Sequence, residues 1–172
     1  MRKLVVCVVL FALTRVAGAA SKDSGYSAHG YAQFGVGGCS IGVGNWVRIG
    51  CGAVLNVVSG GEAFVYRGLA VGAEGGYGWI SGNFNDGVGM FSVNPAYHFK
   101  GQGRSRALVP FVTAGYSMLF RDGHVNGFNT GGGATWWLGA HFGLRCEGRI
   151  HHFAAGPLGA NVYMFRIGLS FR

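Results

Sequence analysis

The sequence has little proline, little charge and no helical periodicity. Only 3 of its 172 residues are proline and only 12% are charged. No apolar run reaches the ~20 residues that a membrane-spanning helix needs, and no long segment repeats apolar residues at the spacing of a helix face. These absences argue against a helical bundle and against a helical membrane protein.

Several binding motifs are also missing. No run of Lys or Arg and no nucleic-acid motif is present, so the formal net charge of +8 does not indicate a DNA or RNA partner. No C-x-x-C motif or zinc-like His/Cys spacing occurs, and we expect no metal and no cofactor. Too few cysteines are present for a disulfide scaffold, and whether Cys39 pairs with Cys51 stays open.

What the sequence does have is glycine and aromatic residues. There are 34 glycines, and aromatic side chains make up 14% of the chain. The glycines follow no Gly-X-Y period, and the aromatic content is too high for a disordered chain. The composition therefore predicts one folded domain that is rich in β-structure.

The first residues are typical of a secretory signal peptide. Arg2 and Lys3 precede an apolar run from Leu4 to Leu13, which is followed by small residues up to Ala20. We predict a signal peptide over residues 1–20 and a single domain over residues 21–172. The protein is then exported, which allows disulfide formation.

Two segments alternate strictly between apolar and polar side chains. In 140–153, Phe142, Leu144 and Ile150 occupy one parity while Arg145 and Arg149 occupy the other. Successive residues of a strand point to opposite faces, so this segment predicts a ribbon with one apolar and one charged side. The C-terminal segment 161–172 repeats the pattern.

Similar alternation continues along the chain and predicts an eight-stranded antiparallel up-and-down β-barrel, with seven strands as the alternative count. The predicted strands cover residues 28–38, 46–58, 68–80, 88–99, 107–120, 128–138, 140–153 and 161–172. Residues 59–67 and 100–106 read as turns, and 40–45, 81–87, 121–127 and 154–160 read as external loops. With an even strand number, both termini lie on the periplasmic side.

Charged and aromatic residues favour a membrane barrel over a soluble one, because a soluble barrel would not fill its core with arginine. The predicted lumen ion-pair network comprises Arg48, Glu74, Arg145, Glu147, Arg149 and Arg166. Such residues fill the narrow interior of a small barrel and must pair there. The predicted outward aromatic girdle comprises Trp79, Phe99, Phe120, Trp136, Tyr163 and Phe171.

The chain resembles the small bacterial outer-membrane β-barrel proteins, the OmpA/OmpX-like group with an outer membrane protein beta-barrel domain. The resemblance lies in PFVTAGYSMLFRDG (110–123), NGFNTGGGATWW (126–137), GLRCEGRIHHF (143–153) and FRIGLSFR (165–172). It implies localisation in the outer membrane, contact with outer-membrane lipid and lipopolysaccharide, and insertion by the barrel assembly machinery through the C-terminal strand.

The resemblance specifies architecture, so function has to be weighed from the residues. We expect a structural or interaction role, a largely plugged lumen and a monomer; a narrow pore, an adhesin or a lipid A-modifying enzyme is the alternative. His151 and His152 resemble in placement the histidine of lipid A deacylase barrels, but no serine stands beside them in the sequence. Without a nucleophile next to a base, we predict no enzymatic activity and interpret the two histidines as a polar rim or a metal-scavenging pair.

Overall fold

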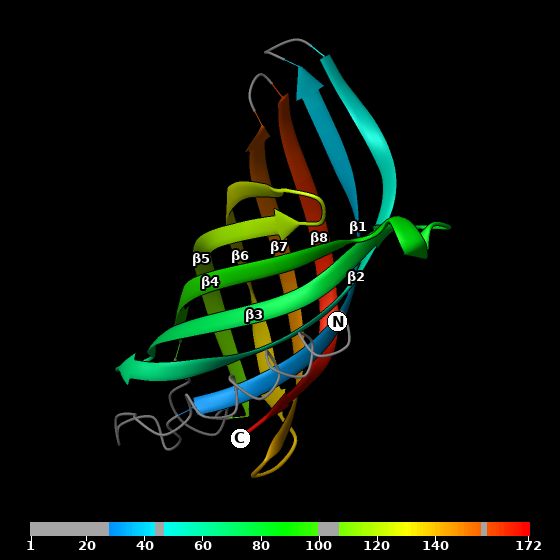
Figure 1. Cartoon of the computed structure of the whole chain (residues 1–172). Helices are drawn as coiled ribbons and strands as arrows, with labels where there is room; N and C mark the ends of the chain where they lie inside the picture. Colours follow the sequence, from blue (N-terminus) through cyan, green and yellow to red (C-terminus); the bar gives the residue numbers. More distant parts are fainter. Residues whose placement is uncertain (1–27, 44–46, 100–106, 156–157) are drawn as a thin grey trace.

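The computed structural model is a closed barrel in which each strand pairs antiparallel with its neighbours, and β1 pairs with β8 (Figure 1). It describes residues 28–43, 47–99, 107–155 and 158–172. The strands are β1 (Ala28–Val43), β2 (Val47–Tyr66), β3 (Leu69–Ile80), β4 (Val88–His98), β5 (Leu108–Phe120), β6 (His124–Trp137), β7 (Phe142–Ala155) and β8 (Leu158–Phe171). The eight-stranded antiparallel barrel that the sequence predicts is therefore confirmed.

The polarity of the barrel is inverted relative to a soluble protein. Val36 on β1 and Ile167 on β8 point outward with exposed fractions of 48% and 45%, whereas Glu74, Arg145 and Arg166 point inward and are 0% exposed. Closure leaves no unpaired sheet edge through most of the barrel, which a bilayer requires. Within the described residues, no helix is long and apolar enough to cross a membrane.

Several strands are longer than the alternation predicts. Residues 59–67 are not a turn, because β2 continues through them to Tyr66 and the chain reverses only at Arg67 and Gly68. Both turn residues have positive φ, 34° and 92°, which matches a two-residue hairpin. Strand β6 begins at His124 and β8 at Leu158, so the connections that precede them are shorter than predicted. The predicted turn at 100–106 and the signal peptide lie outside the described residues.

The two ends of the barrel differ. We call the end where β1 begins and β8 finishes the terminal end, and the opposite end the loop end. At the loop end β1, β2, β7 and β8 reach beyond the other strands (Figure 1). Strand β2 pairs with β3 only from Val54 onward, and the hairpin beyond that point is joined across its strands by a disulfide between Cys39 and Cys51. The question that the sequence leaves open is thus answered in favour of pairing.

Glycine makes room for the large side chains of the lumen. A Cβ on Gly60 of β2 would lie 2.6 Å from the carbonyl oxygen of Ala73, 2.8 Å from Cβ of Glu74 and 2.9 Å from the hydroxyl of Tyr31. Real Cβ atoms are not found so close to backbone. The glycine therefore lets β2 and β3 pair while Tyr31 and Glu74 occupy the space above it.

This crowding predicts an asymmetric effect of two alanine substitutions on the same strand. Gly60→Ala should lower the free energy of unfolding by about 1–3 kcal/mol, because it overpacks the lumen. Gly50→Ala is the matched control, since a Cβ there would meet nothing within 4 Å. Urea titration in detergent, followed by the gel mobility of the folded barrel, measures both. Equal stability of the two variants would contradict the packing argument.

Candidate functional site in the barrel lumen

Five of the six residues predicted for the lumen ion-pair network meet inside the barrel. Glu74 from β3, Arg145, Glu147 and Arg149 from β7, and Arg166 from β8 are each 0–2% exposed. Strand parity alone brings the three β7 residues to one face, since they lie two apart. The backbone of Arg48 pairs with Gly42 in the projecting hairpin, and its side chain lies outside the described part of the chain.

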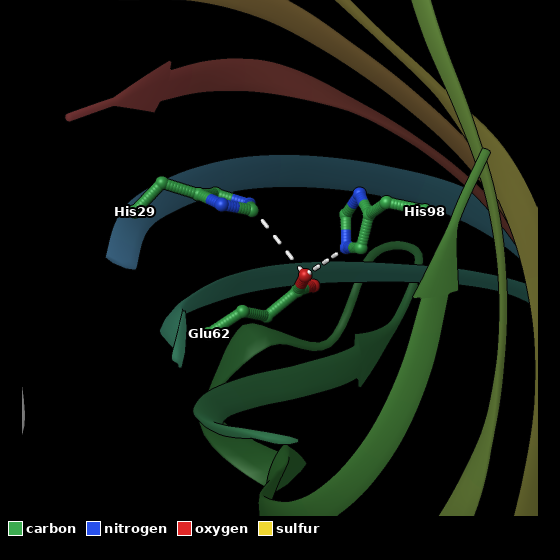
Figure 2. A group of neighbouring side chains, drawn as sticks. All are labelled: His29, Glu62 and His98. Carbon is green, nitrogen blue, oxygen red and sulfur yellow. Dashed lines mark hydrogen bonds and ion pairs between the residues drawn. The ribbon is translucent and has the colours of Figure 1, made fainter. Parts of the chain in front are cut away.

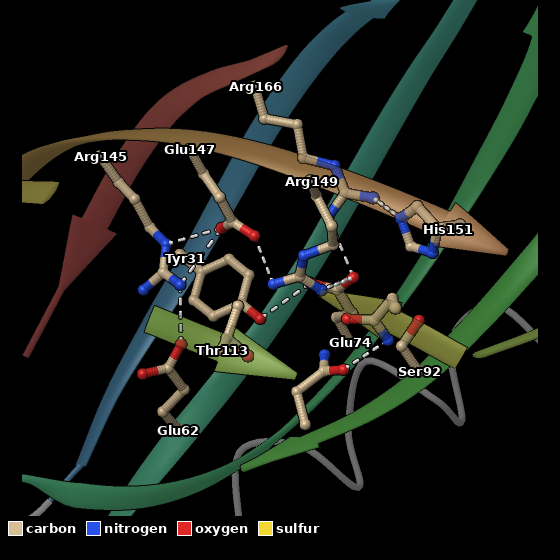
Figure 3. Close-up of polar contacts among 12 residues, drawn as sticks. Tyr31, Glu62, Glu74, Ser92, Thr113, Arg145, Glu147, Arg149, His151 and Arg166 are labelled. Carbon is tan, nitrogen blue, oxygen red and sulfur yellow. Dashed lines mark hydrogen bonds and ion pairs between the residues drawn. The ribbon is translucent and has the colours of Figure 1, made fainter. Parts of the chain in front are cut away.

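Glu74 is shared by three side chains of the lumen. Its Oε1 accepts hydrogen bonds from Arg149 Nη1 at 2.7 Å and Arg166 Nη1 at 3.0 Å, and its Oε2 accepts one from the hydroxyl of Tyr31 at 3.0 Å (Figure 3). Charge-assisted bonds of this kind are the strongest hydrogen bonds in proteins. Strands β1, β3, β7 and β8 are therefore joined through one side chain.

Glu147 continues the network along β7 in both directions. Its Oε1 pairs with Arg149 Nη2, and its Oε2 lies 3.3 Å from Arg145 Nη2. The guanidinium of Arg145 in turn lies over the rings of Tyr31 and Phe111, with its central carbon 4.4 and 3.9 Å from the two centroids. These cation–π contacts stabilise a charge that is fully removed from solvent.

A third carboxylate, which the predicted network lacks, also lies in the lumen. Glu62 falls within the wrongly predicted turn at 59–67, yet it is only 6% exposed and binds Arg145 Nη2 through Oε1 at 2.8 Å. His98 of β4 contacts its Oε2 at 2.5 Å. The signal was present: Asn56, Glu62 and Phe64 share one parity, and following it past Ser59 would have placed Glu62 in the lumen.

A serine does lie beside a histidine, although not in sequence. Ser117 Oγ of β5 is 3.0 Å from His151 Nδ1, and Arg166 Nη2 is 3.0 Å from His151 Nε2. Arginine can only donate, so Nε2 is the acceptor and a neutral imidazole carries its proton on Nδ1. His151 therefore donates to Ser117 instead of removing its proton, which is the wrong arrangement for activating a nucleophile.

His151 and His152 do not form a pair. His151 is 1% exposed inside the lumen, whereas His152 faces the other way and its Nδ1 lies 2.7 Å from Asn161 Oδ1 on β8. Adjacent strand residues point to opposite faces, so they cannot share one metal ion. The interpretation of the two as a joint polar rim or metal-scavenging pair is wrong.

The residues predicted for the aromatic girdle lie on the outer surface. Phe99, Phe120, Trp136, Tyr163 and Phe171 are 44–54% exposed, and Trp79 is half-buried against Phe84 at a centroid distance of 4.9 Å. Phe99, Trp136 and Phe171 lie near the terminal end, and Trp79 and Phe120 near the loop end. Contact with the interfaces of a bilayer remains a prediction for them.

One ion pair joins two loops outside the barrel wall. Arg121 Nη2, after β5, lies 3.0 Å from Asp86 Oδ1 in the short 3₁₀ helix η2 (Phe84–Asp86). Hydrogen bonds from Arg121 and Asn83 hold the pKa of Asp86 below its ordinary value. The ion pair therefore stabilises the contact between the loops fully at pH values above the ordinary pKa of an aspartate. That stabilisation is lost as the pH falls through the lowered pKa of Asp86.

The closed barrel, apolar outer face and charged lumen define the class: this is a small eight-stranded β-barrel with the fold of bacterial outer-membrane barrel proteins. The solved structures that share the fold include Neisserial surface protein A, with a TM-score of 0.55 and 9% identity over 83% of this chain and 96% of that one. They also include the N-terminal β-barrel domain of Pseudomonas aeruginosa OprF (TM-score 0.52, 14% identity, 81% of this chain and 96% of that one) and the outer membrane protein OprG of Pseudomonas aeruginosa (0.51, 12%, 84% and 94%).

The likeness lies in the fold. The sequence matches no protein-family model, and no curated protein matches it significantly. The resemblance to small outer-membrane barrels that the sequence predicts is therefore confirmed by architecture, at identities too low to carry a function from one protein to another.

The shared role of Glu74 predicts a large loss of stability on neutralising it. Glu74→Gln leaves Arg149 and Arg166 without their common counter-charge, and breaking a buried pair costs about 3–5 kcal/mol. Asp122→Asn is the control, because the Asp122 side chain is 93% exposed beside Arg121 and should leave the urea midpoint unchanged. Unfolding in detergent micelles measures both; a Glu74→Gln barrel as stable as the parent would refute the role given to Glu74.

Proposed function

We propose that this protein is a structural or interaction barrel of the outer membrane whose lumen is closed to ions. The observation that carries the proposal is the continuity of the buried polar chain across the interior. In order from the terminal end it comprises His98, Glu62, Arg145, Glu147, Arg149, Glu74, Arg166, His151, Ser117 and Asn129.

Charge balance within this chain supports a closed lumen. Among the described residues it contains three arginines and three glutamates, each glutamate in contact with at least one arginine. An ion entering the lumen would have to separate such pairs, and each separation leaves a buried charge uncompensated. Rings of unpaired charge, which line selective pores, are a different arrangement.

The outer surfaces support a role in interaction. At the loop end the β1–β2 hairpin extends beyond β3 and carries the Cys39–Cys51 disulfide, while the Asp86–Arg121 pair joins two further connections. These contacts restrain the described part of the loop end. A preorganised surface loses less entropy when it binds a partner than a mobile one does.

We further propose that the protein has no enzymatic activity and needs no cofactor to close its lumen. The Ser117–His151 contact supports this, because Arg166 fixes the imidazole in the tautomer that cannot act as a base toward Ser117. Ser117 is also 0% exposed and lies near Ser92 at 2.9 Å, away from the lipid-facing surface that an acyl chain would occupy.

The expected partners are those that an outer-membrane barrel contacts. We propose that the protein acts as a monomer, contacts outer-membrane lipid and lipopolysaccharide through its apolar exterior, and is inserted by the barrel assembly machinery through β8. The outward residues of β8 that support this are Tyr163, Phe165, Ile167, Leu169 and Phe171, all 44–57% exposed.

Planar-bilayer recording tests the closed lumen. The purified wild-type protein should give no steady single-channel steps, whereas the double variant Glu74→Ala, Arg149→Ala should conduct because it removes one central pair from the lumen. The matched control, Asp86→Ala with Arg121→Ala, deletes an exposed ion pair between loops and should stay silent. Mobility shifts on boiling establish that each variant is folded. Steady steps from the wild-type protein would overturn the proposal.

A further inference from the structure

Two histidines and a glutamate converge at the terminal end of the lumen. We call His29 of β1, Glu62 of β2 and His98 of β4 the His–Glu–His cluster (Figure 2). One ligand atom from each lies within 4.8 Å of the other two. All three residues are buried, with exposed fractions of 3–6%. Figure 2 shows both imidazole rings directed at the carboxylate from opposite sides.

Strand register places the cluster without any loop. His29 and Glu62 are directly paired residues of β1 and β2, and both point inward. His98 reaches the same carboxylate from β4, two strands beyond β2. A site whose ligands all come from strands is held more precisely than one built on loops.

Aromatic side chains hold the two imidazoles in place. The Phe64 ring lies 5.7 Å from His29 and 4.9 Å from His98 by ring centroids, and the Phe111 ring lies 5.4 Å from His98. These contacts restrict ring rotation and exclude bulk water. The polar atoms of the cluster therefore converge away from bulk water, where a bound cation would be strongly stabilised by its ligands.

The hydrogen bonds of the cluster identify the atoms that can act as ligands. Arg145 Nη1 lies 3.3 Å from His29 Nε2, and because arginine only donates, that nitrogen presents a lone pair. The same nitrogen lies 3.6 Å from Glu62 Oε2, which as a carboxylate oxygen is also an acceptor. Two acceptors and His98 Nε2 thus face one small volume, and a metal ion there would replace both the Arg145 contact with His29 Nε2 and the hydrogen bond between His98 Nε2 and Glu62 Oε2.

We propose that the His–Glu–His cluster binds a divalent transition-metal ion of the zinc type, through His29 Nε2, His98 Nε2 and Glu62 Oε2. Two imidazoles and one carboxylate are a known ligand set for zinc, at metal–ligand distances of about 2.0–2.2 Å. Tetrahedral coordination at those distances separates ligand atoms by roughly 3.3 Å. The present separations from Glu62 Oε2, 2.5 and 3.6 Å, lie on either side of that value.

Of the two contacts that Arg145 makes with the cluster, coordination would displace the one to His29 Nε2 and keep the one to Glu62. Arg145 binds the other oxygen of Glu62, Oε1, at 2.8 Å, so Oε2 remains directed at the histidines. Its positive charge is shared with Glu147, whose Oε2 lies 3.3 Å away. Calcium and magnesium fit poorly, because they prefer sites made of oxygen ligands.

The bound ion would join β1, β2 and β4 across the lumen. It would add a metal-dependent cross-link between strands at the terminal end. This cross-link goes beyond the proposed closure of the lumen by ion pairs and does not depend on it. By mass action, an ion that binds only the folded barrel raises its stability as the free concentration exceeds Kd.

Zinc titration of the full chain, purified in detergent without a histidine tag, tests the proposal. Calorimetry should give one Zn²⁺ per folded chain, and Co²⁺ should give the visible absorption of a nitrogen- and oxygen-coordinated ion. His29→Gln and His98→Gln should each weaken Zn²⁺ binding by about 100-fold or more, since even residues that only support metal ligands contribute 10–100-fold. Both variants keep the Glu62–Arg145 pair, which favours folding.

His124→Gln and His141→Gln are the controls, because both histidines are exposed and lie outside the cluster. They should bind Zn²⁺ as the parent does. A folded wild-type barrel without stoichiometric binding overturns the site, as does binding that survives in folded His29→Gln and His98→Gln. Should both variants fail to fold, the Cu²⁺ electron paramagnetic resonance spectrum of the wild-type protein decides: coupling to two imidazole nitrogens supports the site, and its absence refutes it.

Discussion

The structure depends on pairing charges in a place where water cannot solvate them. A barrel in hydrocarbon turns its apolar side chains outward, so charged side chains within the membrane-spanning part of its strands are forced into a narrow lumen. There the cost of desolvating an ion is several kcal/mol and is offset only by close partners. Glu62, Glu74 and Glu147 supply those partners for Arg145, Arg149 and Arg166, and the strands that carry them are thereby joined across the interior.

Space is the second requirement, and it follows from the first. Three arginines, three glutamates and several aromatic rings fit inside only because small residues occupy the facing positions, as Gly60 does beneath Tyr31 and Glu74. The same crowding supports a closed lumen. It also restricts the side chains, so that Arg166 sets the tautomer of His151 and the imidazoles of His29 and His98 both face Glu62. Side chains that are carried by strands and packed on all sides are held more precisely than side chains on loops.

Period-two alternation was enough to predict the barrel, its polarity and most of the inward residues, because side-chain direction in a strand is a local property. Strand ends were less predictable. The Gly-rich segment around Glu62 has the composition of a turn, and only pairing with β1 and β3 makes it strand. Contacts between distant strands, such as Ser117 with His151 or His98 with Glu62, depend on barrel closure and register, which no local pattern encodes. The Cys39–Cys51 bond depends on register in the same way.

The inside-out polarity is tested most directly by two adjacent tryptophans. Trp136 points outward and is 54% exposed, whereas Trp137 points into the lumen and is 6% exposed. Two chains, each retaining one of these tryptophans with the others replaced by Phe, are reconstituted into vesicles of lipid brominated in its acyl chains. Bromine should quench the fluorescence of Trp136 strongly and leave that of Trp137 nearly unchanged. Equal quenching of both, or stronger quenching of Trp137, would contradict the account.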